Sequence, residues 1–128
     1  MAVVGVACGE TTRPIARPNL DPTLAAGTYV LEAVSGRGPA SGTFVLAGSG
    51  EAERRVQYIA PSWMAGVELV AVGTFRLYAD SIEFAFREDA GRSSYDWTVR
   101  GVRSAERFSI RHPDPADGPD IVETYRRQ

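Results

Sequence analysis

Lysine is absent from this chain of 128 residues, and all fourteen basic side chains are arginine. Sixteen acidic residues outnumber them and give a formal net charge of −2. This balance provides no general positive charge that would attract nucleic acid or an anionic membrane surface. We attribute the choice of arginine over lysine to codon usage, so it does not by itself predict a phosphate-binding site.

Adjacent arginines occur at positions 54–55 and 126–127, within stretches that we expect to be strands. Neighbouring side chains on a strand point to opposite faces, so each pair splits between the two sides of the sheet. This placement favours solvated arginines, or ion pairs with the nearby glutamates Glu51, Glu53 or Glu123, over a stripe that binds nucleic acid.

Cysteine and histidine are equally scarce, with one residue of each. A lone cysteine, Cys8, cannot form a disulfide within the chain. His112 precedes a proline, which favours an exposed loop histidine over a catalytic or metal-binding one. The aspartates of the loop 112–120 are typical of a solvated turn and do not follow the EF-hand spacing. We therefore predict no enzyme, no cofactor and no metal site.

Long apolar runs are also missing, because no stretch approaches the roughly 20 apolar residues that span a membrane as a helix. The chain instead shows a two-residue alternation between Gly66 and Asp89. One face of this stretch carries Val67, Leu69, Ala71, Gly73, Phe75 and Leu77, followed after a turn at Asp80-Ser81 by Ile82, Phe84 and Phe86. Alternation across a hairpin predicts an antiparallel sheet with one buried face.

The rest of the chain from Gly27 repeats this pattern in short segments separated by glycine and proline turns. The expected strands lie within 27–36, 41–50, 51–60, 93–101, 105–112 and 120–128. With the hairpin they make about eight strands and no long helix. Short connections favour an up-and-down meander, and closure hides its two edges. We predict an all-β fold, an antiparallel up-and-down eight-stranded barrel; a two-sheet β-sandwich shares the pattern and remains the alternative.

The first 26 residues differ in composition from the rest. Residues 1–8 read MAVVGVAC, and residues 9–26 have the proline- and threonine-rich composition of a linker. The ending Val6-Ala7-Cys8 resembles the end of a bacterial lipoprotein signal peptide. The resemblance implies lipidation at Cys8, a tether over 9–26 and a barrel domain over 27–128. The alternative is a short apolar N-terminus that packs on the sheet or frays.

The resemblance also implies a location. Gly9 occupies the position where an aspartate would retain a lipoprotein at the inner membrane. We therefore expect a cell-envelope protein anchored to the outer membrane through the lipid on Cys8. A soluble protein, either secreted or cytoplasmic, is the alternative.

The barrel segment adds a family resemblance. A GTY-V-L start with a glycine/proline turn over Gly27 to Pro39, two GTF-x-L strands, and the ending Tyr125-Arg126-Arg127-Gln128 are similar to small bacterial lipocalin-like lipoproteins of the calycin group. Gly27-Thr28-Tyr29 stands where standard lipocalins carry a G-x-W motif. The resemblance implies a barrel that encloses a small apolar ligand.

Aromatic side chains are the main candidates for a binding site, because a small barrel is either filled by its own side chains or holds one small ligand. Our leading hypothesis is non-enzymatic binding of a small apolar or amphipathic ligand. Residues expected to line the pocket are Tyr29, Phe75, Phe84, Phe86, Tyr95 and Trp97. Trp63 and Met64 lie in a loop between Pro61 and Gly66, and would gate it. The alternative is a solid-core domain that holds a protein partner in the envelope.

Overall fold

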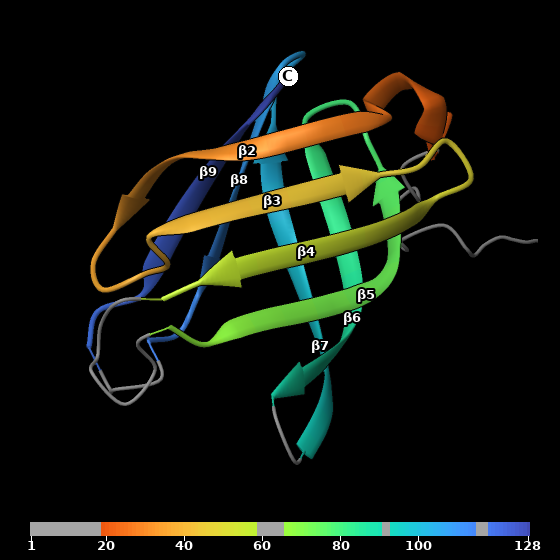
Figure 1. The fold of residues 1–128 in the computed structure, drawn as a ribbon. Coiled ribbons are helices and arrows are strands. Elements are labelled where there is room, and N and C mark those ends of the chain that lie inside the picture. Colours follow the sequence, from red (N-terminus) through yellow and green to blue (C-terminus); the bar gives the residue numbers. More distant parts are fainter. Residues whose placement is uncertain (1–18, 59–65, 91–92, 115–117) are drawn as a thin grey trace, which may run out of the picture.

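The computed structural model describes residues 19–58, 66–90, 93–114 and 118–128 (Figure 1). Their elements are the 3-10 helix η1 (Pro22–Ala25) and the strands β2 (Gly27–Ser35), β3 (Ser41–Leu46), β4 (Glu51–Gln57), β5 (Glu68–Leu77), β6 (Ser81–Ala90), β7 (Ser93–Arg103), β8 (Arg107–His112) and β9 (Ile121–Arg127). Within the described residues, no helix has the length and apolarity needed to cross a membrane.

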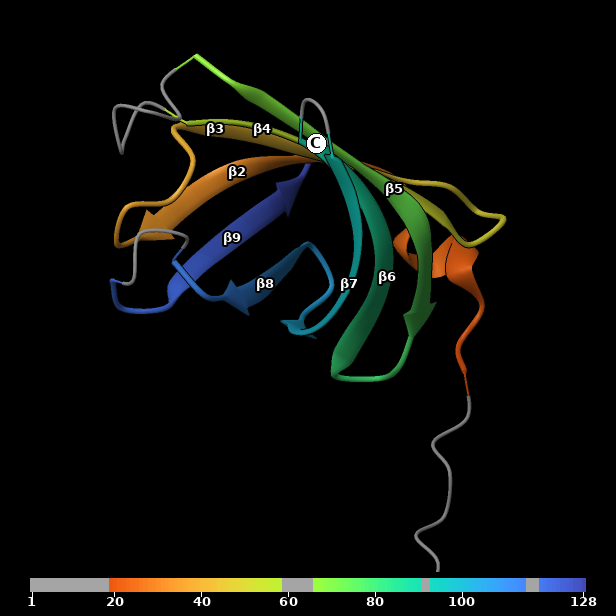
Figure 2. The ribbon, with the colours of Figure 1, turned by 90° about the horizontal axis from the view of Figure 1, so that it is seen from below.

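Every strand pairs antiparallel with its neighbours in sequence, and β9 returns to pair with β2. The sheet therefore closes into an up-and-down barrel of eight strands, which Figures 1 and 2 show from the side and from below. This confirms the predicted fold class and excludes the β-sandwich. Closure leaves no strand at the end of the sheet, as expected for a meander with short connections.

The alternation between Gly66 and Asp89 has the predicted consequence. The buried side chains of β5 and β6 include Leu69, Ala71, Phe75, Leu77, Ile82, Phe84 and Phe86. Val67 precedes β5 and is exposed. Gly73 takes an inward position, and a Cβ added there would lie 1.8 Å from the carbonyl oxygen of Ala85. Glycine is needed here because the two strands approach more closely than a side chain would allow, as is common where a sheet bends.

Two details differ from the predicted pattern. The pairing of β2 with β9 shifts register between Leu31 and Ala33, so Ala33 is exposed instead of following Leu31 inward. A β-bulge of this kind reverses the alternation without leaving a mark in composition.

The second difference concerns the predicted linker, whose last residues pack against the barrel. The backbone N–H of Leu20 donates to the carbonyl of Leu77 at 2.7 Å, and Ala25 in η1 is buried. The hydroxyl of Tyr29 donates to the carbonyl of Ala25 at 2.9 Å. Residues 19–26 therefore belong to the folded domain and lie beside β5 (Figure 2).

Aromatic side chains fill much of the barrel interior. Phe44 is fully buried, and its ring centroid lies 4.6 Å from that of Tyr125 and 5.0 Å from that of Phe84. The cluster around it consists of Tyr29, Phe75, Phe84, Phe86, Phe108 and Tyr125. Each such side chain contributes about 2 kcal/mol when fully buried. This part of the interior is packed, whereas the end of the barrel near Tyr58 and Leu69 has a different character.

Candidate functional site

Three charged side chains point into the barrel instead of out to solvent. Arg54 on β4, Glu88 on β6 and Glu123 on β9 are each at most 3% exposed. They occupy inward positions of the strand alternation: Arg54, for example, lies between the buried residues Ala52 and Val56. Burying an ion costs several kcal/mol unless it is paired and hydrogen-bonded, so their mutual arrangement determines whether this end of the barrel is stable.

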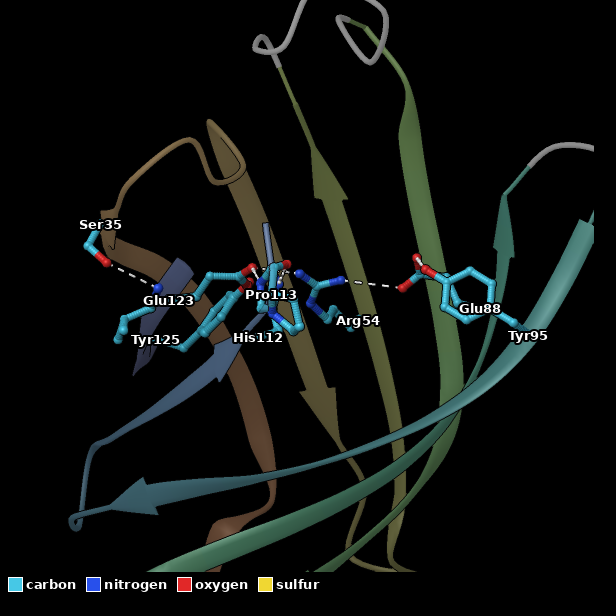
Figure 3. A network of polar contacts seen from close by, with 9 residues as sticks. Ser35, Arg54, Glu88, Tyr95, His112, Pro113, Glu123 and Tyr125 are labelled. Atoms are coloured by element: carbon cyan, nitrogen blue, oxygen red, sulfur yellow. Dashed lines mark hydrogen bonds and ion pairs between the residues drawn. The ribbon is translucent and has the colours of Figure 1, made fainter. Parts of the chain in front are cut away.

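The strand register brings these groups together. Arg54 pairs with Ala71 on β5, and Ala71 pairs with Glu88 on β6. The small side chain of Ala71 leaves room for Arg54 Nη1 to lie 3.5 Å from Glu88 Oε1. On the other side, Arg54 Nη2 donates to Glu123 Oε2 at 2.7 Å. One guanidinium therefore joins two buried carboxylates across the barrel (Figure 3).

Two tyrosine hydroxyls also donate hydrogen bonds to these carboxylates. The hydroxyl of Tyr125 donates to Glu123 Oε1 at 2.6 Å, and the hydroxyl of Tyr95 donates to Glu88 Oε2 at 2.5 Å. Burial raises the pKa of both tyrosines, and the neighbouring carboxylates raise it further. The two phenols are therefore neutral hydrogen-bond donors at physiological pH.

The electrostatic balance keeps the ion pair charged. Burial raises the pKa of Glu123, but the hydrogen bond from His112 and the charge of Arg54 outweigh this, so the pKa lies below its ordinary value. Burial lowers the pKa of Arg54, and the charge of Glu123 more than compensates, so its pKa is raised. Arg54 and Glu123 are thus both ionised near neutral pH.

His112 corrects the prediction of an exposed loop histidine. It is the last residue of β8, its side chain is only 14% exposed, and its Nε2 contacts Glu123 Oε2. Pro113 follows the end of the strand, so His112 still belongs to β8 and its imidazole points into the barrel. His112 is therefore part of the charged cluster (Figure 3).

A cavity of about 290 Å³ lies beside this cluster. The residues lining it are Arg54, Tyr58, Leu69, Glu88, Tyr95, Trp97, His112 and Pro113. The ring of Trp97 is 5.1 Å from that of Phe86, and the guanidinium carbon of Arg54 lies 5.5 Å from the Trp97 ring centroid. The cavity thus combines an aromatic wall with a few convergent polar groups, and its size is at the lower end for small-molecule sites.

Two buried donors at this cavity are left unsatisfied. Arg54 Nε and Trp97 Nε1 have no hydrogen-bond partner within the described part of the chain, and both side chains line the cavity. An unpaired buried donor costs about 1–3 kcal/mol. Such groups are rare in native proteins, and each of these two atoms exposes less than 1 Å², so neither faces the open space of the cavity directly.

The residues predicted from sequence to bind a ligand fall into three groups. Tyr95 and Trp97 line the cavity. Tyr29, Phe75, Phe84 and Phe86 belong to the packed aromatic core. Trp63, Met64 and Cys8 lie outside the described residues. Sequence reasoning did not identify Glu88 or His112 as site residues, and it placed Arg54 correctly only as a candidate partner of Glu123.

The other hollows of the structure lack buried charged side chains among their described lining residues. A larger hollow of about 400 Å³ is lined by residues of β2, β3 and β4. Two others lie along β5, β6 and β7: one of about 530 Å³, lined by Arg76 and Arg100 among others, and one of about 490 Å³. The described residues include no group of three or more histidine, cysteine or acidic side chains that could hold a metal ion.

No protein-family model, curated protein or solved structure matches this chain. What the site does must therefore follow from its own geometry and chemistry.

Removing one charge from the buried cluster should destabilise the fold far more than removing all three charges of Arg54, Glu88 and Glu123. Glu123→Gln leaves Arg54 with one carboxylate at 3.5 Å, and we expect a loss of about 3–5 kcal/mol in the free energy of unfolding by urea. The variant Arg54→Met/Glu88→Gln/Glu123→Gln should be more stable than Glu123→Gln alone. Arg55→Gln, which breaks only exposed ion pairs, is the control and should cost less than about 1 kcal/mol. Equal stability of wild type and Glu123→Gln would contradict the pairing.

The lowered pKa of Glu123 predicts a specific loss of stability in acid. Its folded-state pKa lies below the ordinary value of 4.5, so its contribution is complete above that pH and disappears as the pH falls through the folded-state pKa. Urea unfolding from pH 7 to pH 3 should therefore show a smaller decline for Glu123→Gln than for wild type. Parallel declines would show that Glu123 has the same pKa in the folded and unfolded states.

Proposed function

We propose that the polar end of this barrel binds a small amphipathic molecule without transforming it. The observation that carries the proposal is the cavity itself, where an aromatic wall meets the buried charged side chains Arg54 and Glu88. In this proposal the apolar part of the ligand packs against Trp97 and Tyr95. Its polar part faces the charged side chains Arg54 and Glu88, which line the same cavity.

The energetic cost of the cluster supports a role in recognition. Replacing a buried ion pair with apolar side chains of similar volume is often neutral or stabilising. The packed aromatic cluster around Phe44 shows that this chain fills the barrel interior with apolar groups elsewhere. Three buried charges beside a cavity are therefore better explained by a bound polar group than by stability.

Binding is favoured over catalysis by the chemistry of the lining residues. Within the described residues, no serine, threonine or cysteine lines the cavity. Of the two lining tyrosines, Tyr95 donates its hydroxyl to Glu88, and burial raises the pKa of both Tyr95 and Tyr58, which makes them poor nucleophiles. Arg54 and Glu123 are paired with each other, so the charged groups are arranged to hold a polar group in place.

Two residues that line the cavity adjoin, in the sequence, the segment that carries the predicted gate. Tyr58 and Leu69 lie on either side of the segment that contains Trp63 and Met64, and both line the cavity. The backbone N–H of Gly66 donates to the carbonyl of Tyr58 at 2.9 Å, which closes the base of that segment. We therefore retain the proposal that Trp63 and Met64 control access to the ligand.

Fluorescence can test ligand binding, because the chain has only two tryptophans. In a Trp63→Phe background, Trp97 is the sole tryptophan. Titration with 8-anilinonaphthalene-1-sulfonate should quench the fluorescence of Trp97, while the fluorescence of the probe rises and saturates at one probe per chain. Leu69→Phe narrows the cavity from a buried position and should weaken binding at least about tenfold, as expected for a site filled by added volume. Val72→Phe, on the exposed side of the same strand, is the matched control.

Three results would decide the matter. Saturable quenching that Leu69→Phe abolishes and Val72→Phe leaves intact supports the cavity. Flat Trp97 emission, or equal binding by both variants, would overturn it.

The envelope location is a separate proposal, and it rests on Cys8. We propose that Cys8 carries a diacylglyceryl group that anchors the barrel to a bacterial membrane. Intact mass of the protein purified from its own cells should show cleavage before Cys8 together with a lipid adduct, and Cys8→Ser should release the protein from membranes. An uncleaved and unmodified chain would remove the anchor without affecting the cavity.

A further inference from the structure

Strand β7 leaves part of one edge unpaired beside the cavity. It pairs with β6 from Ser93 to Val102, but with β8 only from Gly101 to Arg103. Among the described residues, 93–99 therefore have no strand on their second side. Figure 1 shows β7 and β8 diverging from the ends where they pair.

The cavity borders the opening between these two strands. Tyr95 and Trp97 line it from the unpaired part of β7, and His112 and Pro113 line it from the end of β8. The ring centroids of Trp97 and His112 lie 6.5 Å apart, and Tyr95 is 49% exposed. In Figure 3, Tyr95 and His112 lie on either side of Arg54, and β7 curves away from β8. A ligand between the strands would therefore meet the backbone edge of β7 and the cavity together.

Backbone hydrogen bonds indicate which groups of β7 face the unpaired edge. The N–H of Arg103 donates to the carbonyl of Asp80 on the β6 side, and the N–H of Ser104 donates to the carbonyl of Arg107 on the β8 side. Donors and acceptors of successive residues alternate between the two sides of a strand. The residues that direct both backbone groups toward the unpaired edge are therefore Ser94, Asp96 and Thr98.

The edge lacks the features that usually prevent further pairing. Residues 93–99 contain no proline and no lysine, and the pairing of β6 with β7 shows no bulge. The side chains that face the cavity from this edge are incompletely covered, since Tyr95 is exposed and Trp97 is half-buried. An added strand would satisfy the backbone and cover these side chains together.

We propose that an extended peptide pairs antiparallel with residues 94–98 of β7 and places two apolar side chains in the cavity. The proposal rests on the function proposed above and identifies its amphipathic ligand as a peptide. Added strands are held by backbone hydrogen bonds and selected by pockets for alternate side chains. Here alternate residues of β7 supply the backbone groups, and the cavity beside Tyr95 and Trp97 supplies the pocket.

Charge and burial specify the side chains of the peptide. The residue opposite Asp96 lies on the solvent side of the sheet, where Arg87 Nη1 is 3.3 Å from Asp96 Oδ1. A lysine at this peptide position extends a row of alternating sign, since opposite charges are favourable cross-strand neighbours. The residues opposite Trp97 and Tyr95 share the cavity-facing side and should be apolar. The preferred peptide thus has a basic residue between two apolar residues.

The length of the peptide follows from the position of β8. The pairing of Gly101 with Ile110 fills the second edge of β7 from that point onward. Arg100 adjoins this pair, so the added strand has to end beside Thr98. A peptide of about five residues fits these limits, whereas a longer strand, such as β7 of a second copy, would meet β8. So short a strand predicts weak, reversible binding.

Hydrogen exchange followed by NMR tests strand addition. The probe acetyl-Thr-Leu-Lys-Leu-Ser-amide places its threonine opposite Thr98, its lysine opposite Asp96 and its serine opposite Ser94. At about ten times its dissociation constant, it should slow exchange of these three backbone amides about tenfold, because only the unbound protein exchanges them. The amides of Tyr95 and Trp97 face β6 and should not change. This two-residue alternation distinguishes an added strand from a ligand that only fills the cavity.

N-methylation provides matched control peptides with unchanged side chains. A methyl group on the backbone nitrogen of the lysine removes a donor to β7 and should weaken binding at least about tenfold. A methyl group on the backbone nitrogen of the second leucine, which faces away from β7, should change the affinity less than about threefold. In the variant Asp96→Lys the charge preference should reverse, so that acetyl-Thr-Leu-Glu-Leu-Ser-amide binds more tightly than the lysine peptide.

The outcomes separate this proposal from the function on which it rests. Saturable binding of 8-anilinonaphthalene-1-sulfonate, with no peptide effect on the amides of Asp96 and Thr98, would overturn strand addition and leave the cavity site standing. If neither probe binds, both proposals fail. Equal affinity of the two N-methylated peptides would overturn the pairing. So would protection of Asp96 and Thr98 in the free protein as strong as that of Trp97, because the edge would then already be covered.

Discussion

The guanidinium of Arg54 lies between two buried carboxylates, and the polar end of the barrel depends on that arrangement. Without Glu123 at 2.7 Å and Glu88 at 3.5 Å, a positive charge would be isolated in the interior. Without Arg54, two negative charges would face each other there. Because either loss costs several kcal/mol, the three side chains constrain one another and hold β4, β6 and β9 in register. The hydroxyls of Tyr95 and Tyr125 then complete the hydrogen bonding.

This constraint divides the barrel interior into two parts with different roles. Around Phe44, aromatic rings in close contact provide most of the hydrophobic stabilisation. Around Arg54, charged side chains need space for their partners, and the short side chain of Ala71 provides some of it. A cavity of about 290 Å³ remains beside them. The packed aromatic core and the charged cavity are therefore neighbours inside one small barrel, since Phe44 pairs directly with Arg54, and the cavity is the basis for the proposed ligand site.

Much of the fold could be predicted because alternate residues of a strand face the barrel interior and the solvent, so the sequence pattern shows which side chains are buried. The buried positions of β5 and β6 follow the sequence pattern residue by residue, and short turns determine the order of strands. The bulge in β2 could not be predicted, because an extra residue in a ladder depends on the pairing with β9. The packing of residues 19–26 could not be predicted either, because a proline-rich composition describes local flexibility and not contacts with the barrel end.

The charged site was within reach of the same reasoning but was not identified. Glu88 continues the inward positions of Phe84 and Phe86, and Glu123 lies between the inward residues Ile121 and Tyr125. A charged residue at an inward position of a strand would have indicated a buried charged site. An interpretation based on residue type alone assigns such a residue to the solvent-exposed surface. The prediction for His112 was wrong because a proline does not prevent the preceding residue from belonging to a strand, and β8 continues through His112.

The two unsatisfied donors offer the most direct test that this end of the barrel holds a ligand. In ¹⁵N NMR spectra, the side-chain Nε–H of Arg54 and the indole N–H of Trp97 each give a separate resonance, which substitution of either residue assigns. Addition of 8-anilinonaphthalene-1-sulfonate should shift both resonances together and leave the backbone amide of Phe44 unchanged. If both resonances stay fixed while amides on the outer face of the barrel shift, the polar end is a structural feature and not a binding site.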